Sequence, residues 1–414
     1  ESRGILQRSV AVGALTKLDP VQTSDLASQV LVKAQTIQSA EFIFEAYLAK
    51  EKASKYLASA LSGKKINSEV AAAGVRKSLS SGGDTSQLVD ALSKSGSLQP
   101  IVQGLSDDEM KSLMSEVQSK GDAVRGEIIY RKNQLLCQAC HAIGGGGGLI
   151  GPDLVSIGSS APVDYIIDSL LEPAKKIKEG YHTTVITTKG GDLITGGLIR
   201  EGDREIVLRM ADGSERKIAT ATIKKKEISP ISLMPPGLTA SLRKDEFIDL
   251  VRFLSSLGKE GDYKVPSGRY VRRWRVLPAH NKAGNLIRTK GIQYTVNGNN
   301  DLPWKASYSQ VNGELPIKEV GINNGFNNKL SVAKFEITVS VPGKIGLSIA
   351  DPKGLQIIVG GKMADASTES VFELGKGMHD ITIVIDRDVR ESNLKVQLFD
   401  VSGSSGRASL IGGA

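Results

Sequence analysis

Two cysteines occur among the 414 residues, Cys137 and Cys140, and they directly precede His141, which is one of four histidines. They lie in the segment "LCQACHAIGGGGGLIGPDL", residues 135–153. Thiols and imidazoles ligate soft and borderline metals, and thiols also carry covalent redox groups. The spacing therefore indicates that this short segment is where the chain does its chemistry.

Four kinds of chemistry compete for this C-x-x-C-H pattern. A structural zinc site needs four ligands, and no second Cys or His pair lies at ligand spacing. A thioredoxin-like redox pair expects a preceding strand, whereas a helical pattern leads into these cysteines. A disulfide here closes too small a loop to stabilise much and leaves His141 unexplained. We favour the remaining interpretation, the covalent attachment of one c-type haem.

This interpretation assigns a role to each residue of the motif. Cys137 and Cys140 would form thioethers, and the turn between them would bring His141 under the iron as an axial ligand. His141 then needs an acceptor for its second ring nitrogen, and the rigid turn "GPDL" predicts that Pro152 orients it. We expect glycines 144–148 to pass around the porphyrin edge, with a flexible surface loop as the alternative.

A sixth iron ligand is expected from Met234 in "SLMPPGL", because the flanking prolines keep that segment extended. A lone methionine more often fills a core, and Met210 is expected to do so on a strand. His182 is the second candidate for the sixth ligand, and an open sixth position is the third.

The elements that must position these residues form three predicted domains. Residues 1–119 have apolar residues at helical spacing and short Gly/Ser turns, which predicts an α-helical, HEAT-like segment, with an irregular helical bundle as the alternative. In residues 120–260 we expect a c-type cytochrome domain with an all-α core. Its "GDAVRGEIIYRKNQLL" reads as one helix running into the cysteines, and "LRKDEFIDLVRFLSSLG" as an amphipathic final helix. Ser106 and Glu109 form a capping box for a helix that closes on Gly121.

Between the two cytochrome helices, residues 182–229 alternate apolar and polar side chains between Gly-containing turns. This pattern predicts about five antiparallel strands that form a small inserted β-barrel. Residues 261–414 also alternate with period two and are interrupted by Pro-Gly and Gly-Lys-Gly, which predicts an all-β, jelly-roll-like sandwich. The fold class is therefore multidomain α+β.

The C-terminal sandwich carries two weaker signals for binding. Trp274 and Trp304 are candidates for stacking on a carbohydrate ring, although tryptophans are more often buried in a core. Asp351 and Asp380 lie in turns, but they lack the ligand spacing of a calcium loop.

Composition excludes other classes of protein. The net charge is +8 and the pI about 9.2, but the basic residues are spread along the chain and aromatics make up only 5%. We therefore predict a solvated surface and no nucleic-acid partner. No apolar run is long enough for a membrane span. The first residues are typical of the interior of a helical protein, so Glu1 is expected to be a processed end or the start of a fragment.

The motifs of residues 120–260 resemble the haem-binding cytochrome c module of planctomycete and verrucomicrobial proteins. The resemblance is carried by "LLCQACHAIG", "GPDLVSIGSS", "DYIIDSLLEPAKKIKEGY", "SLMPPGL" and "DEFIDLVRFLSSLG". It implies a class I cytochrome c core with a β-barrel inserted before the methionine ligand. It also implies that the first helix crosses the last at Gly126 and Tyr130, which would face Phe247, Val251 and Leu254.

The resemblance further implies a bacterial protein of the periplasm or another extracytoplasmic location, where haem c is attached. We expect a monohaem electron-transfer protein rather than a catalyst, with a dehydrogenase as electron donor and a downstream acceptor. One alternative is a haem enzyme or a gas or redox sensor with a displaceable sixth ligand. The other is a carbohydrate- or protein-binding module that carries a haem.

Overall fold

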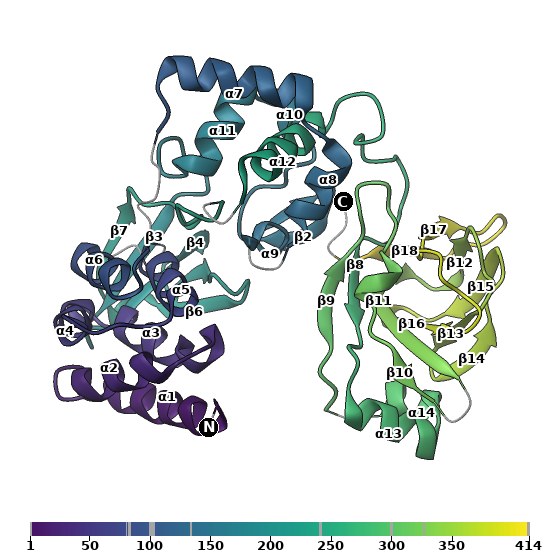
Figure 1. Cartoon of the computed structure of the whole chain (residues 1–414). Coiled ribbons are helices and arrows are strands. Elements are labelled where there is room, and N and C mark those ends of the chain that lie inside the picture. The colour runs from purple at the N-terminus through teal and green to yellow at the C-terminus, as the bar shows by residue number, and fades with distance from the viewer. Residues whose placement is uncertain are drawn as a thin grey trace. The chain divides into compact units, whose positions relative to one another are not determined.

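The computed structural model describes residues 2–79, 81, 84–98, 104–132, 135–239, 242–298, 301–325 and 328–411. They form two compact units, one within 1–140, 149–152 and 161–255, the other within 141–148, 153–160 and 256–414. The N-terminal region is helical, and mostly antiparallel sheets follow it (Figure 1). The predicted multidomain α+β class is therefore confirmed. None of the described helices is long and apolar enough to cross a membrane.

Six helices build the N-terminal region in two interleaved rows. α1, α3 and α5 pack in succession, α2, α4 and α6 pack in succession, and α1–α2 and α5–α6 also contact one another. Their shared core is apolar and includes the fully buried Leu31, Phe44 and Leu57. The bounds are α1 (Ser2–Thr16), α2 (Ser24–Lys33), η1 (Ile37–Ser39), α3 (Glu41–Leu48), α4 (Ala53–Ala60), α5 (Ser68–Leu79) and α6 (Ser86–Ser95).

The helices that follow carry the candidate site. The predicted capping box is confirmed, because the Ser106 hydroxyl accepts the Glu109 N–H at 3.4 Å and the Glu109 carboxylate accepts the Ser106 N–H at 2.8 Å. The helix ends before Gly121, also as predicted. These helices are α7 (Asp107–Lys120), α8 (Ala123–Tyr130), α9 (Cys137–Cys140), α10 (Ile157–Ser160), α11 (Val163–Leu171) and α12 (Lys244–Ser256).

The prediction of one continuous helix into the cysteines is wrong. α8 ends at Tyr130, and Leu136 adopts a φ of 57°, a left-handed conformation that no right-handed helix contains. Asn133 and Gln134 lie outside the described residues. A new helical turn, α9, therefore begins at Cys137 itself.

Five antiparallel strands occupy residues 183–229, close to the predicted insert. Their order is β6-β5-β4-β3-β7, and Met210 packs with their core of Ile186, Leu208 and neighbours, as predicted. The sheet is not a closed barrel, because β6 and β7 form its two edges, separated by the turn η3 (Thr220–Thr222). The strands are β3 (Thr183–Thr188), β4 (Leu193–Glu201), β5 (Glu205–Arg209), β6 (Glu215–Ala219) and β7 (Ile223–Ser229).

This inserted sheet is joined to the N-terminal helices by main-chain hydrogen bonds. Leu193 N donates to Ala49 O at 2.8 Å, and Glu51 N donates to Gly191 O at 3.2 Å. Between them, the Lys50 ammonium pairs with the Asp192 carboxylate at 2.7 Å. The β3–β4 turn is therefore paired with the α3–α4 turn, which the sequence did not indicate.

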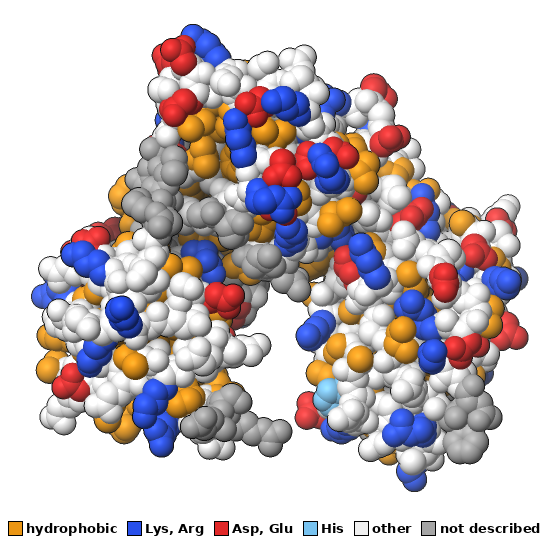
Figure 2. Space-filling model, in the orientation of Figure 1, with side chains coloured by type: hydrophobic (Ala, Val, Ile, Leu, Met, Phe, Trp, Pro, Cys, Tyr) orange, Lys and Arg blue, Asp and Glu red, His pale blue; other side chains and the backbone are white. Residues whose placement is uncertain are grey.

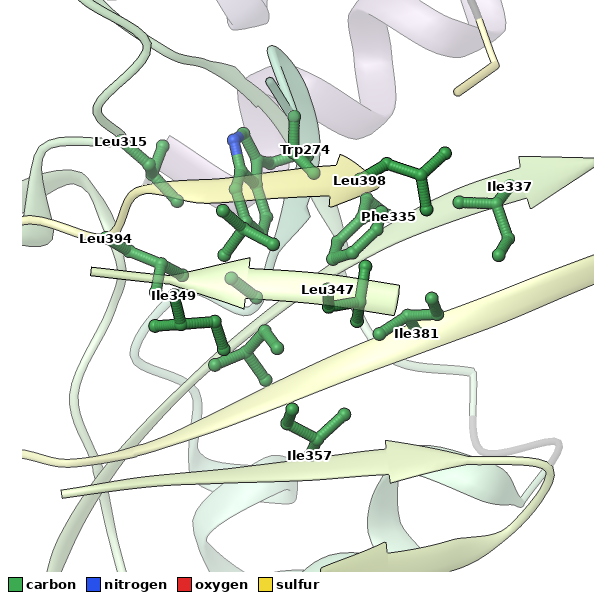
Figure 3. Packing of buried hydrophobic residues seen from close by; sticks show 14 of the residues in the cluster. Trp274, Leu315, Phe335, Ile337, Leu347, Ile349, Ile357, Ile381, Leu394 and Leu398 are labelled. Carbon is green, nitrogen blue, oxygen red and sulfur yellow. The ribbon is translucent and has the colours of Figure 1, made fainter. Parts of the chain in front are cut away.

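Two antiparallel sheets enclose the core of the C-terminal region. Six strands of the larger sheet run in the order β14-β13-β16-β11-β8-β9, with β10 and β18 also paired to β11, and the smaller sheet is β15-β12-β17. Figure 3 shows Leu347 and Leu398 of the smaller sheet packed with Trp274, Phe335 and Ile381 of the larger. The strands are β8 (Arg273–Val276), β9 (Lys305–Tyr308), β10 (Asn323–Asn324), β11 (Lys329–Val341), β12 (Gly343–Ile349), β13 (Leu355–Val359), β14 (Lys362–Asp365), β15 (Glu369–Leu374), β16 (Gly377–Asp386), β17 (Val396–Asp400) and β18 (Arg407–Leu410).

The prediction of an all-β C-terminal region needs a correction. Helices α13 (Asn281–Lys290) and α14 (Ile292–Asn297) and the turn η4 (Ile317–Glu319) also lie there. Ala283 and Ile287, one helical turn apart, pack against Val332 and Leu330 of β11, respectively. Helices therefore cover the face of the larger sheet that does not meet the smaller sheet.

Charges of both signs are mixed on the surface. On the face seen in Figure 2, Lys and Arg side chains are interspersed with Asp and Glu side chains, with no single basic patch on either unit.

Candidate functional site

The C-x-x-C-H segment consists of one helical turn followed by a strand. α9 spans Cys137 to Cys140, so the two thiols are three residues apart and lie on one side of the turn. His141 follows at once as the first residue of β1 (His141–Ile143). Both cysteines are free and half-buried. The three predicted residues thus lie on two short consecutive elements, the helical turn α9 and the strand β1.

The environment of the thiols opposes ionisation. Burial raises the pKa of the Cys137 thiol to about 12 and also raises the pKa of Cys140. A redox-active or zinc-binding cysteine instead needs a stabilised thiolate. In the described part of the chain, no three His, Cys, Asp or Glu side chains form a metal-ligand group. A thioether sulfur is uncharged, so it suits this apolar surrounding better than a thiolate does.

Backbone hydrogen bonds fix the carbonyl groups on both sides of His141. Cys140 O accepts the N–H of Ile150 at 3.1 Å and of Gly151 at 2.8 Å. Ala142 O accepts the N–H of Leu154 at 2.8 Å. Along the chain, His141 lies between the two acceptors and Pro152 lies between the donors. This register fits the predicted role of Pro152 in orienting the imidazole.

The glycine run is a tightly packed strand rather than a flexible surface loop. Gly146–Leu149 form β2, which pairs with β1, and Gly145 to Gly148 are buried. At Gly147, where φ is 148°, a β-carbon would lie 2.1 Å from the His141 carbonyl oxygen. The surface-loop alternative is therefore wrong, and the close approach of this backbone to His141 requires glycine at position 147.

Asp153 anchors the start of the glycine run, a role that was not predicted from the sequence. Its carboxylate accepts the backbone N–H groups of Gly144 at 3.0 Å, Gly145 at 2.9 Å and Val155 at 2.8 Å. The contact to Val155, two residues on, is the turn that Asp commonly makes with its own backbone. That local signal was present in "GPDLV", whereas the bonds to the glycines depend on the fold.

Helices α8 and α12 cross at Gly126, as the resemblance implies (Figure 1). A β-carbon on Gly126 would lie 2.1 Å from Asp249 O and 2.6 Å from Phe253 Cβ. The rings of Tyr130 and Phe253 lie 5.6 Å apart between centroids. Asp249 and Phe253 of α12 therefore meet α8 at this crossing, in addition to the residues that the resemblance implies. Phe247, Val251 and Leu254 are buried as well.

Charged groups strengthen this crossing. The Asp249 side chain is 3% exposed; one of its carboxylate oxygens lies 2.9 Å from Arg125 Nε. Its other oxygen accepts the Asp122 N–H at 2.8 Å, at the N-terminus of α8. Lys132 Nζ donates to Glu246 at 2.7 Å. These bonds tie both ends of α8, and thus the approach to Cys137, to the final helix.

Met234 lies in the loop between β7 and α12, and it is half-buried. Its N–H donates to the Ser232 hydroxyl at 3.1 Å. That hydrogen bond stays within the loop, so the assignment of Met234 as sixth ligand remains a prediction. His182, the second candidate, is exposed directly before β3.

The fit to a covalent haem rests on the donor set and its apolar surroundings. Leu136 and Leu149 are 45% and 44% exposed, next to Cys137 and at the end of β2. Exposed apolar side chains next to the motif along the chain and at the end of β2 suit contact with a porphyrin better than contact with water. The residues present therefore fit the group that the sequence predicts.

The candidate binding residues of the C-terminal sandwich make contacts within the sandwich itself. Trp274 is 2% exposed, and its Nε1 donates to Ser309 Oγ at 3.0 Å, so it belongs to the core. Over the Trp304 ring, the Lys334 ammonium lies 4.5 Å from the centroid. Asp351 is paired with Arg390, and Asp380 with Arg275 and Lys334.

Comparison with known proteins assigns no family. No family model matches the chain, and no curated protein matches it. The resemblance to cytochrome c modules therefore rests on the sequence motifs.

Proposed function

We propose that residues 120–260 bind one covalent haem c and that the chain transfers single electrons. The observation that supports this most is the set of backbone hydrogen bonds accepted by Cys140 O and Ala142 O. These bonds fix the main chain on both sides of His141, directly after the helical turn that holds both thiols. When bound, the haem supplies a one-electron Fe(III)/Fe(II) couple.

Each residue has a defined task in this proposal. Cys137 and Cys140 would hold the group through their sulfur atoms, and His141 would supply one ring nitrogen to the iron. The Pro152 carbonyl oxygen would accept a hydrogen bond from the other ring nitrogen and so fix the plane of the imidazole. Met234 would supply a thioether sulfur as a further ligand, and such a ligand raises the potential and excludes small ligands.

The proposal also covers the folds of the three domains. Residues 120–260 form a class I cytochrome c core, for which the Gly126 crossing is the supporting contact. The alternating rows of α1–α6 support a HEAT-like arrangement, and the two facing sheets support a jelly-roll-like sandwich. The inserted sheet restrains the Met234 loop, because Leu233 packs beside Gly197 of β4.

We place the protein in an extracytoplasmic compartment of a bacterium, where thioether attachment takes place. Its electron donor is a dehydrogenase, and an acceptor follows downstream. The alternatives are a haem enzyme or sensor, in which the sixth ligand is displaced, and a binding module that carries a haem.

Intact-protein mass spectrometry after production with a bacterial haem c maturation system tests the proposal. We expect one haem per chain that survives denaturation, and none in the Cys137→Ala/Cys140→Ala double variant. Met234→Ala should retain the attached haem and gain binding of carbon monoxide or cyanide. Absence of attached haem in the unchanged chain would overturn the proposal. Rapid binding of these ligands by the unchanged chain would favour the enzyme or sensor.

A further inference from the structure

One cross-strand pair of the inserted sheet lies beside both segments that carry candidate iron ligands. Gly197 on β4 and Arg209 on β5 lie directly opposite each other. Arg209 contacts the end of β2, the strand paired with the β1 strand of His141, and Gly197 lies beside the loop that contains Met234. Two segments that are far apart in sequence therefore share one support.

On the His141 side, Arg209 acts through a single peptide group. Its Nη1 donates to Leu149 O at 2.9 Å, and the N–H of the same peptide, that of Ile150, donates to Cys140 O at 3.1 Å. A charged donor polarises the amide that it binds, and such chains of hydrogen bonds reinforce one another. The guanidinium thus strengthens the bond that holds the carbonyl next to His141.

Arg209 is itself held in place. Its Nη2 donates to the Glu215 carboxylate at 3.1 Å, from the residue opposite it on β6. Its side chain is only 26% exposed. Because the aliphatic part is packed and the guanidinium is anchored, little conformational entropy remains to be lost in binding Leu149 O.

On the Met234 side, Gly197 lies beside Leu233, the residue that precedes Met234. A β-carbon at position 197 would lie 3.8 Å from Leu233 Cδ1, which is an ordinary packing distance. The neighbouring Gly196 has its position fixed more tightly, since a β-carbon there would lie 2.5 Å from Arg209 O. Leu233 therefore rests against a part of the sheet where the two strands approach closely.

We propose that Arg209 is a positioning residue for His141, and that the Gly197–Arg209 pair supports both the segment that carries His141 and the loop that carries Met234. This inference rests on the proposed haem function. Arg209 does not touch the iron; it acts through the Leu149–Ile150 peptide and Cys140 O. Leu233 in turn positions Met234, its neighbour in the chain, by packing beside Gly197.

Amide hydrogen exchange followed by NMR tests the hydrogen-bond chain in the full-length protein. Arg209→Ala should speed exchange of the Ile150 and Gly151 amides by about tenfold, and Arg209→Lys should restore part of the protection. Arg200→Ala is the matched control, because Arg200 is an exposed arginine of the same sheet that pairs with Glu205. Equal exchange rates in Arg209→Ala and Arg200→Ala would overturn the role of Arg209.

Spectroscopy of the ferric holoprotein separates positioning from a merely structural effect. Arg209→Ala should move the paramagnetically shifted ring resonances of His141, whereas Leu233→Ala should weaken the far-red Met–Fe(III) band and leave Ile150 exchange unchanged. Unmoved His141 resonances in Arg209→Ala would contradict positioning even if exchange increased. A chain without covalent haem would overturn the proposed function, whereas an unchanged Ile150 amide in a haem-loaded chain would overturn this inference alone.

Discussion

Gly126 on α8 lies directly against the main chain of Asp249 on α12, so close that a β-carbon on Gly126 would fall 2.1 Å from the Asp249 carbonyl oxygen. The two helices can approach to this distance only because position 126 has no side chain. Tyr130, one turn later, then meets Phe253. The crossing fixes the helix from which the chain continues to Cys137.

Gly126→Ala is predicted to destabilise the helical unit although alanine favours helices. The methyl group would force α8 and α12 apart, at a cost of about 1–3 kcal/mol. Gly4→Ala on α1 is the control, because no atom lies within 4 Å of a β-carbon there. Urea unfolding followed by far-UV circular dichroism measures both. Equal midpoints for the two variants would show that the crossing tolerates a side chain.

The link between Lys132 and Glu246 predicts a specific response to acid. The hydrogen bond from Lys132, followed by that from Arg243 N–H, lowers the pKa of Glu246 from its ordinary value of 4.5. A lowered carboxyl pKa contributes stability above the unfolded-state value, and this contribution is lost as the pH falls through the folded-state value. Glu246→Gln should therefore lose less stability than the unchanged protein below about pH 4.5. Parallel losses in thermal melts at descending pH would contradict this assignment.

Much of the fold could be predicted because its signals are local. The capping box at Ser106 and Glu109, the strands of 183–229 and the packing of Met210 all follow from patterns within a few residues. The break before the cysteines could not be predicted, because Leu136 adopts a positive φ that its residue type disfavours. The open edges of the inserted sheet depend on pairing between distant strands, which alternation alone does not determine.

In the candidate site, too, residues with a local sequence signal could be predicted and residues that act through distant contacts could not. C-x-x-C-H is a local motif, so Cys137, Cys140 and His141 were identifiable at once. Arg209 and Asp249 were not, because each acts on a segment at least 60 positions away in sequence. Ala283 and Ile287 of α13 did carry a helical pattern, ended by Gly291, which the strand-like sequence around it obscured.

Replacing residues 183–228 with a short Gly/Ser linker should separate haem attachment from methionine ligation. The linker closes without strain because Thr183 pairs with Ser229 at the base of the sheet. We expect the haem to stay attached, since Cys137 and Cys140 lie outside the insert, while the Met–Fe(III) band weakens and the potential falls. An unchanged spectrum and potential would instead assign the insert to partner docking.

Trp274 and Trp304 should differ strongly in what they contribute to the C-terminal sandwich. Trp274→Ala removes a core side chain that packs edge-on against Phe335, 5.2 Å away, and should cost about 3–5 kcal/mol. Trp304→Ala should cost less, about 1–2 kcal/mol, because Trp304 is only partly buried against the cluster of Leu277, Ala283 and Val332 and otherwise loses the contact with Lys334. Each variant keeps the other tryptophan as a fluorescent reporter of unfolding. Similar losses in both would contradict the assignment of Trp274 to the core.

The most direct test of the haem proposal is one pair of ultraviolet–visible spectra of the purified full-length protein, oxidised and then reduced. If the chain binds haem c as proposed, the reduced protein shows the sharp α and β bands of a low-spin c-type haem, and the oxidised protein shows a far-red Met–Fe(III) band that disappears in Met234→Ala. A chain that absorbs only in the ultraviolet after production with the haem c maturation system would contradict it.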